Sequence, residues 1–269
     1  MIKISAYEHL NVKENPVENA KAVVVINHGF AEHMGRYDWV CDTLNASGYS
    51  VVRYEVRNHG QTSALLESYR DFINDFDLLI DRVASTYPGL DIFTLGHSMG
   101  GMITGMYGLV HAEKLKGQIL SGAALHYVPA IKGIKKPVLD FVATVFPNMM
   151  IKNIVDEGLC SVSEVVDKYK RDPLVLRKAP AVFYREFTIQ APKFIEEHVE
   201  DYTLPVLLLH GEKDTIVPPS ISEWFYDKIQ SSDKTRITYP NLQHEILNEY
   251  AKEEVMGDII NWLDKHRSN

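Results

Sequence analysis

The residues with the clearest potential for chemistry are the GHSMG sequence at positions 96–100, with Ser98 at its centre. An apolar run that ends at Leu95 precedes this sequence, and a helix-compatible stretch, residues 101–110, follows it. A strand, a sharp turn flanked by glycines and a helix together lift a serine hydroxyl clear of a sheet edge, where a substrate can reach it. A glycine-rich turn or helix cap is the alternative interpretation. We predict that Ser98 is a nucleophile.

A serine hydroxyl needs a neighbouring base that takes its proton, and eleven histidines compete for that role. Around a nucleophile of this kind the chain order is serine, acid, histidine, with the acid after a later strand and the histidine after the last one. Asp214 follows the apolar run 206–209, and His244 follows the run 236–239. We therefore predict that Asp214 orients the imidazole of His244, with Glu212 as the nearest rival acid.

The same chemistry needs hydrogen-bond donors for the oxyanion that develops on the substrate. One donor is the backbone N–H of the residue after the nucleophile, here Met99, and the other comes from the loop after an early strand. The sequence HGF at 28–30 is the candidate loop, because Gly29 frees the backbone to aim the N–H of Phe30 at the site. An ordinary strand-to-helix turn is the alternative interpretation.

Elements that would position these residues alternate along the chain. Short apolar runs occupy residues 22–26, 49–56, 91–95, 118–120, 206–209 and 236–239, and apolar residues recur at helical spacing over 72–83 and 255–263. Apolar runs without polar alternation are typical of strands that are buried on both faces of a parallel sheet. We predict the α/β fold class, with a mostly parallel, doubly wound sheet and a ligand site beyond the carboxyl ends of its strands.

The alternation stops between residues 122 and 202, where apolar and charged residues mix at helical spacing and prolines are frequent. We predict a helical cap of residues 122–202, inserted into a core of residues 1–121 and 203–269. Packing of the cap onto the core explains its apolar residues as well as a pocket does. The candidates for an acyl pocket are Phe30, Val138, Leu139, Phe141, Val142, Val145, Phe146, Met149 and Met150.

Composition limits the function classes. The 269 residues are 45% apolar and 24% charged, as in an ordinary globular protein, and the net charge of -8 disfavours nucleic acid as a partner. We expect no secretory signal and no membrane span. Cys41 and Cys160 are too few for a disulfide framework and lack metal-ligand spacing. We predict a cytoplasmic protein that uses no metal ion or cofactor.

Several stretches of the chain carry the pattern of a known family. They are HGFAEH at 28–33 with Arg36 and Tyr37, GHSMGG at 96–101, GEKDTIV at 211–217 and QHE at 243–245. With these stretches the chain resembles the monoglyceride lipase and lysophospholipase group of α/β-hydrolases, serine hydrolases that also include proline-releasing aminopeptidases. The likeness covers nearly the whole chain. It implies the α/β-hydrolase fold and places nucleophile, acid, base and oxyanion donors on the positions identified above.

Two loops depart from the family pattern. Ala31 stands where the family usually has a second glycine in the oxyanion loop. Residues 55–60 read EVRNHG, where the family usually has an aspartate and two glycines around the histidine. These departures bear on acyl preference and leave the triad unaffected. We expect His33 and His59 to brace loops by hydrogen bonding.

Three functions fit these residues. The first is an esterase that cleaves single-chain lipids, monoacylglycerols or lysophospholipids, through an acyl-enzyme, with a transient contact between the cap and a membrane surface. The second is an aminopeptidase of the proline-releasing type, which needs clustered acids in the cap; the candidates are Glu157, Glu164, Glu186, Glu196 and Glu197, and they are scattered. The third is a ligand-binding homologue without catalysis. The complete set of triad residues favours an enzyme.

Overall fold

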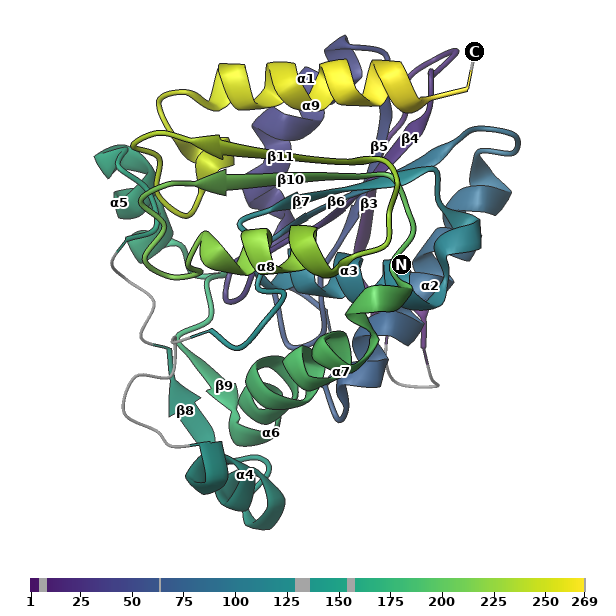
Figure 1. Cartoon of the computed structure of the whole chain (residues 1–269). Coiled ribbons are helices and arrows are strands. Elements are labelled where there is room, and N and C mark those ends of the chain that lie inside the picture. Colours follow the sequence, from purple (N-terminus) through teal and green to yellow (C-terminus); the bar gives the residue numbers. More distant parts are fainter. Residues whose placement is uncertain (5–8, 63, 129–135, 154–157, 269) are drawn as a thin grey trace.

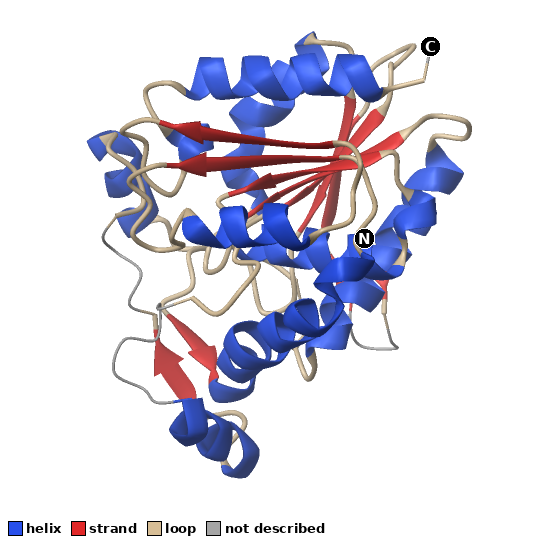
Figure 2. Cartoon of the chain, viewed as in Figure 1, coloured by secondary structure: helices blue, strands red, loops and turns tan. Residues whose placement is uncertain are grey.

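A seven-stranded sheet with the strand order β11-β10-β7-β6-β4-β5-β3 forms the centre of the molecule in the computed structural model (Figures 1 and 2). The structure describes residues 1–4, 9–62, 64–128, 136–153 and 158–268. The strands are β3 (Val12–Asn15), β4 (Val23–Asn27), β5 (Ser50–Tyr54), β6 (Ile92–His97), β7 (Gly117–Ser121), β10 (Val206–Gly211) and β11 (Lys234–Tyr239). Every pairing is parallel except that of β3 with β5. The predicted α/β class and mostly parallel sheet are confirmed.

Helices cover both faces of this sheet, as Figure 1 shows. On one face lie α1 (Asp38–Ala46) and α9 (Lys252–His266), and on the other lie α2 (Tyr69–Thr86), α3 (Met99–Val110) and α8 (Ser220–Lys228). The start of α2 has a capping box, in which the side chains of Ser68 and Asp71 accept backbone N–H groups. A short strand pair, β1 (Ile2–Lys3) and β2 (His9–Leu10), lies outside the main sheet.

Burial on both faces explains why the sequence of strand β4 is apolar without alternation. Val23 and Val25 pack into the core layer that contains α2, α3 and α8. Val24 and Ile26 pack into the opposite layer, which contains α1 and α9. Successive side chains of a strand point to opposite faces, so a strand covered on both sides needs apolar residues at every position. Each such side chain stabilises the fold by about 1.5–3 kcal/mol.

The segment between β7 and β10 corresponds to the cap region of the sequence. Its helices are α4 (Lys136–Val145), α5 (Ser163–Arg171), α6 (Ala181–Arg185) and α7 (Ala191–His198), with a π-helical turn at Glu186–Gln190. It also contains an antiparallel pair, β8 (Met150–Lys152) and β9 (Lys178–Pro180). These three-residue strands contain lysine and proline and lack an apolar run, so the sequence pattern does not reveal them. Helix α7 packs against α3 of the core.

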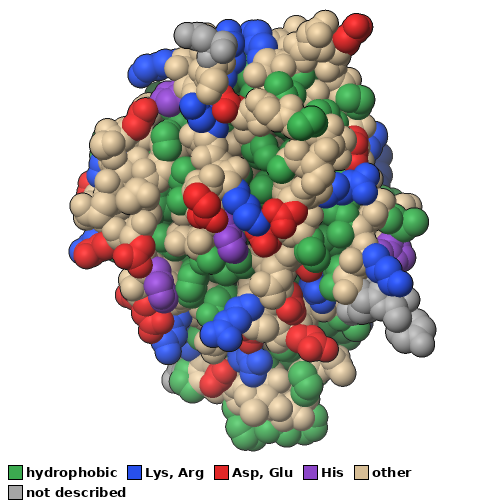
Figure 3. Space-filling view, turned by 90° about the vertical axis from the view of Figure 1, so that its right-hand side faces the viewer, with side chains coloured by type: hydrophobic (Ala, Val, Ile, Leu, Met, Phe, Trp, Pro, Cys, Tyr) green, Lys and Arg blue, Asp and Glu red, His purple; other side chains and the backbone are tan. Residues whose placement is uncertain are grey.

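Helix α4 places its apolar residues on the surface. Figure 3 shows hydrophobic side chains gathered at the lower end of the molecule, where α4 lies. Phe141 is 64% exposed and Phe146 is 59% exposed, and Val138, Val145, Met149 and Met150 are exposed as well. Only Leu139 and Ala143 of α4 are buried among the residues described there. No described helix is both long and apolar enough to cross a membrane.

Candidate active site

Ser98 stands at the junction of β6 and α3 with φ 54° and ψ −118°, a strained conformation for a residue with a side chain. The flanking glycines make this turn possible. A Cβ at Gly96 would lie 2.4 Å from the carbonyl oxygen of Gly100, and a Cβ at Gly100 would lie 2.3 Å from that of Asn27. The N–H of Ser98 donates to the carbonyl of Ser121 on the adjacent strand at 2.9 Å. The surrounding backbone thus holds the geometry of a nucleophile elbow.

Asp214 and His244 come from neighbouring strand ends. Strands β10 and β11 pair in parallel, so the loops after them emerge at the same edge of the sheet. Nδ1 of His244 lies 2.6 Å from Oδ2 of Asp214, and both side chains are buried. Oδ1 of Asp214 accepts the N–H groups of Ile216 and Val217 at 2.9 and 2.8 Å. Because an ionised carboxylate only accepts hydrogen bonds, the proton lies on Nδ1 and Nε2 of His244 is available as a base.

Burial and charge act against each other on this pair. Burial alone lowers the pKa of His244, but the carboxylate of Asp214 outweighs it and raises that pKa above its usual value. Burial alone raises the pKa of Asp214, but His244 and His210 outweigh it and hold that pKa well below its usual range. Asp214 therefore stays ionised, and the imidazole of His244 is stabilised when it takes up a proton.

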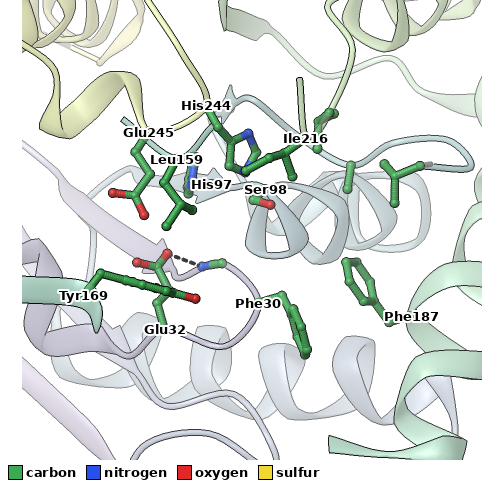
Figure 4. Close-up of a pocket in the computed structure, with 14 residues that line it drawn as sticks. Phe30, Glu32, His97, Ser98, Leu159, Tyr169, Phe187, Ile216, His244 and Glu245 are labelled. Carbon is green, nitrogen blue, oxygen red and sulfur yellow. Dashed lines mark hydrogen bonds between the residues drawn. The ribbon is translucent and has the colours of Figure 1, made fainter. Parts of the chain in front are cut away.

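A cavity with about 490 Å³ of empty space, its open mouth included, lies in front of Ser98 (Figure 4). Glu32, His97, His244 and Glu245 form its polar wall. The remaining wall is largely apolar and consists of Gly29, Phe30, Ala124, Val128, Leu159, Tyr169, Phe187, Ile216 and Val217. Figure 4 shows the acidic side chains on one side of Ser98 and Phe187 on the other. The cavity therefore has a polar end and an apolar end with the serine between them.

The loop with the predicted oxyanion donor Phe30 is held rigidly. The N–H of Gly29 donates to Oε1 of Glu32 at 2.6 Å, and the N–H of Ala31 donates to Nε2 of His59 at 3.0 Å. Ala31 has a positive φ of 66°, the conformation for which the family usually has glycine. Within the described part of the chain, the N–H groups of Phe30 and Met99 make no hydrogen bond with another residue. Both remain available as donors to a bound oxyanion.

A buried ionic network links the oxyanion loop to the loop that carries His244. Arg36 donates from Nη1 and Nη2 to both oxygens of Glu245 at 2.7 Å, and from Nη1 to Oε2 of Glu32 at 2.6 Å. The hydroxyl of Tyr37 donates to Oε1 of Glu32 at 2.7 Å. Burial alone raises the pKa of Glu32, but Arg36 and two neighbouring histidines outweigh it and lower the pKa to about 2. The sequence does not predict this network, although all four of its residues lie in the stretches that carry the family pattern.

The two histidines expected to brace loops do so. His59 accepts the N–H of Ala31, and its Nδ1 lies 2.8 Å from the carbonyl of Arg57, to which it donates. Burial lowers the pKa of His59 to about 3, so the ring is neutral at pH 7. Nδ1 of His33 accepts the N–H of Gly35 at 3.1 Å, and its Nε2 lies 2.8 Å from Oδ2 of Asp172. His33 thereby ties the oxyanion loop to the segment between β7 and β10.

The structure brings together only part of the predicted site. Ser98, Asp214 and His244 meet at one edge of the sheet, with Phe30 in the cavity wall and Met99 buried behind the serine. The predicted acyl pocket is corrected at its cap residues. Among the described residues, the cavity wall includes none of Val138, Phe141, Val142, Val145 and Phe146.

The apolar wall is instead built from scattered positions, such as Val128, Leu159, Phe187 and Ile216. The apolar pattern of α4 showed an amphipathic helix but could not show what its apolar face meets. The rival acid Glu212 is exposed and accepts the N–H of Asn241 at 3.3 Å, so it is not part of the cavity wall.

In the described part of the chain, no group of three or more His, Cys, Asp or Glu side chains is arranged to hold a metal ion. Both cysteines are buried thiols outside the cavity wall. Burial raises the pKa of Cys41 to about 11 and that of Cys160 to about 12, so neither is a reactive thiolate at pH 7. The nucleophilic side chain that faces the cavity is the hydroxyl of Ser98.

Fold and site together define a serine hydrolase of the α/β-hydrolase class. The family model described as serine aminopeptidase, S33, matches residues 18–251, and the chain belongs to that family.

The named relatives within this class are mostly lipases. A monoacylglycerol lipase of Mycolicibacterium smegmatis is 32% identical over 255 residues, which cover 93% of this chain and 91% of the relative. A monoglyceride lipase of Mus musculus is 28% identical and covers 94% and 85%. The crystal structure of Paleococcus ferrophilus monoacylglycerol lipase matches with a TM-score of 0.87 at 25% identity, over 96% of this chain and 99% of that one. The chain is thus an ester hydrolase similar to monoglyceride lipases.

Proposed function

We propose that this protein hydrolyses carboxylic esters of single-chain lipids, monoacylglycerols or lysophospholipids, with Ser98 as nucleophile, His244 as base and Asp214 as the orienting acid. The observation that carries the proposal is the buried contact of 2.6 Å between His244 and Asp214 at a cavity that also contains Ser98. The similarity to the monoacylglycerol lipase of Mycolicibacterium smegmatis and the monoglyceride lipase of Mus musculus supports this substrate class.

The proposed reaction has two half-reactions. Nε2 of His244 takes the hydroxyl proton as Oγ of Ser98 attacks the ester carbonyl carbon. The resulting oxyanion accepts hydrogen bonds from the N–H groups of Phe30 and Met99. The C–O bond to the alcohol then breaks, the alcohol oxygen takes the proton from His244, and the acyl group stays on Ser98. Water repeats the sequence, releases the fatty acid and restores the serine.

The two ends of the cavity suit the two halves of such an ester. The apolar end, with Phe30, Phe187 and Ile216, suits a hydrocarbon chain. The polar end, with Glu32 and Glu245, suits a hydroxylated alcohol.

The aminopeptidase alternative also needs carboxylates, which would bind a substrate amine. Both oxygens of Glu245 already accept from Arg36, and both oxygens of Glu32 accept from protein donors. Arg36 bridges these two carboxylates and offsets part of their charge, which weakens their attraction for a substrate ammonium group. A neutral hydroxyl needs only a second lone pair on a carboxylate oxygen, so the ester proposal is the better supported one.

Lengthening the acyl chain of the substrate should raise kcat/KM several-fold per added methylene until the apolar end is full, because each buried methylene contributes about 0.8 kcal/mol. The measurement is kcat/KM for p-nitrophenyl esters from acetyl to palmitoyl, together with glyceryl monoesters, triacylglycerols and a prolyl amide. Triacylglycerols and the amide should be poor substrates. The variant Ile216→Trp should shorten the optimal chain and leave the acetyl ester unaffected, because Ile216 lines the apolar end.

If kcat/KM of the unmodified protein stayed constant or fell from the acetyl to the palmitoyl ester, the lipid proposal would be wrong. A prolyl amide that is cleaved faster than every ester would support the aminopeptidase instead. A protein that binds long-chain esters without turnover would be the ligand-binding homologue.

The proposal also assigns residues 122–202 the role of a cap that docks on a lipid surface through α4. Exposed Phe141 and Phe146 lie on the same cap as the exposed Lys152 and Lys178, which face each other across the β8–β9 pair. A segment that exposes both apolar side chains and lysines suits a membrane with anionic lipid, since each buried aromatic ring contributes about 1.5–3 kcal/mol and each lysine near the surface adds about 1 kcal/mol.

Exchanging both Phe141 and Phe146 for serine should lower the fraction of protein that sediments with phosphatidylserine-containing vesicles by at least tenfold, at unchanged kcat/KM on p-nitrophenyl acetate. Val110, which is 44% exposed at the end of α3, provides the matched control, and Val110→Ser should bind vesicles like the unmodified protein. Equal binding by all three proteins would contradict a docking role for α4.

A further inference from the structure

His210 is a buried histidine for which the proposed reaction has no use. It lies near the end of β10, has no exposed surface and is not part of the cavity wall among the described residues. Its Nε2 lies 3.1 Å from Oδ2 of Asp214 and 2.8 Å from the carbonyl oxygen of Val217. Its Nδ1 lies 2.5 Å from Oγ of Ser222 in α8. Two imidazoles, those of His210 and His244, therefore share one oxygen of the proposed triad acid.

The partners of His210 determine which ring nitrogen carries the proton. The carbonyl of Val217 and the carboxylate of Asp214 can only accept hydrogen bonds, so Nε2 must carry a proton and shares it between them. The hydroxyl of Ser222 can donate to Nδ1, so one ring proton, on Nε2, satisfies all three partners.

Asp214 therefore accepts four hydrogen bonds from four different donors. Oδ1 accepts the N–H groups of Ile216 and Val217, and Oδ2 accepts from His244 and His210. The backbone donors hold one oxygen, but a carboxylate held at one oxygen can still swing the other. The N–H of His210 donates to that other oxygen, Oδ2, and so restrains it. We propose that His210 is a positioning residue, which keeps Oδ2 of Asp214 aimed at Nδ1 of His244.

This inference rests on the proposed triad and adds a prediction of its own. The contact between Oδ2 of Asp214 and Nδ1 of His244 raises the pKa of His244. If loss of the His210 bond lets Oδ2 turn away, that pKa should fall, and the acidic limb of the kcat/KM profile should move to lower pH. The other charged or titratable groups that act on His244, namely His97, Glu32 and Glu245, are unchanged by a substitution at 210.

The test compares His210→Leu with His210→Gln. Leucine removes the donor and keeps the site filled, whereas the glutamine amide places an N–H the same number of bonds from Cβ as Nε2 of histidine. We expect His210→Leu to lower kcat about tenfold, the usual effect of losing one hydrogen bond to a charged group, with KM unchanged because His210 does not reach the cavity. The acidic limb should move to lower pH. His210→Gln should recover most of kcat and the original limb.

The variant Ser222→Ala is the matched control for a purely structural role. It removes a buried hydrogen bond from the same cluster and leaves the proton on Nε2 in place. We expect it to lower Tm without moving the pH profile. If His210→Leu changed only Tm, or if Ser222→Ala moved the acidic limb equally, the positioning role would be overturned.

A double-mutant cycle separates this inference from the triad itself. If His210 acts through Asp214, then His210→Leu should cost no further activity in the Asp214→Asn background. Additive losses would overturn the inference and leave the triad intact. An Asp214→Asn protein with unaltered turnover would instead overturn the proposed triad, whatever the variants at 210 do. If His210→Leu proves too unstable to purify, His210→Met, which also lacks the donor, takes its place in the cycle.

Discussion

Replacing Ser98 by alanine should abolish labelling by a fluorophosphonate probe and lower kcat/KM on a p-nitrophenyl ester by about 10⁵-fold or more. The reason is that no other activated nucleophile faces the cavity among the described residues, so any remaining turnover relies on water, the oxyanion donors and binding alone. The fold should survive, because the loss of one hydroxyl relieves rather than adds crowding at a turn with φ 54°. Circular dichroism and the melting temperature check that point.

Ser121 is the matched control for this experiment. It is buried at the end of β7 and is not part of the cavity wall. Its carbonyl oxygen and its Oγ lie 3.1 and 3.3 Å from Nδ1 of His97. Ser121→Ala should still be labelled once by the probe. Undiminished labelling of Ser98→Ala, or labelling at a second serine, would show that the nucleophile has been misassigned.

The sequence predicted the sheet because burial on both faces leaves a simple pattern. β4 alternates its side chains between two apolar layers, so every residue from Val23 to Ile26 is apolar. The sequence does not predict β3, because this strand is not buried on both faces. It is an antiparallel edge strand whose last three residues are Lys13, Glu14 and Asn15, and polar residues are what an edge strand needs in order to avoid pairing with other chains.

The proposed triad could be inferred because each member follows a strand, and parallel strands bring their carboxyl ends together. The partners that support the triad could not be inferred in this way. Arg36 and Glu245 are far apart in the sequence, and their ion pair depends on how two loops fold over the sheet. The role of His210 could not be inferred either. Its position before Gly211 indicates the end of a strand, and only the structure shows that its N–H contacts Asp214.

The lining of the pocket is what the sequence of the cap predicts least well. Helix α4 is amphipathic, and such a helix is explained equally by packing, by a pocket or by a surface that meets lipid. The residues that form the apolar wall, among them Leu159 and Phe187, lie in separate elements and carry no shared periodicity. Long-range packing therefore decides the lining, and a local pattern cannot report it.

Exchanging Asp214 for asparagine should lower kcat/KM by about 10⁴-fold, and the hydrogen bonds of the carboxylate explain why. The N–H groups of Ile216 and Val217 both point at Oδ1, so the amide oxygen of an asparagine must stay at that position. The NH₂ group then takes the place of Oδ2 and donates to Nδ1 of His244. This forces the ring proton onto Nε2, where it blocks the acceptance of the serine proton.

The pH dependence gives a second readout of the same substitution. The carboxylate of Asp214 raises the pKa of His244, and the base must be neutral to act, so activity rises with pH through that pKa. Asparagine removes the charge, and the remaining activity should therefore set in at lower pH, in the direction expected for His210→Leu but by a larger amount. Glu212→Gln is the control, since Glu212 is exposed and should change kcat/KM less than twofold. If Glu212→Gln proved the more damaging of the two, the orienting acid would lie at 212. If both acids were dispensable, His244 would have to be oriented by its neighbours Glu245 and Arg36, and the buried ion pair would become the next group to test.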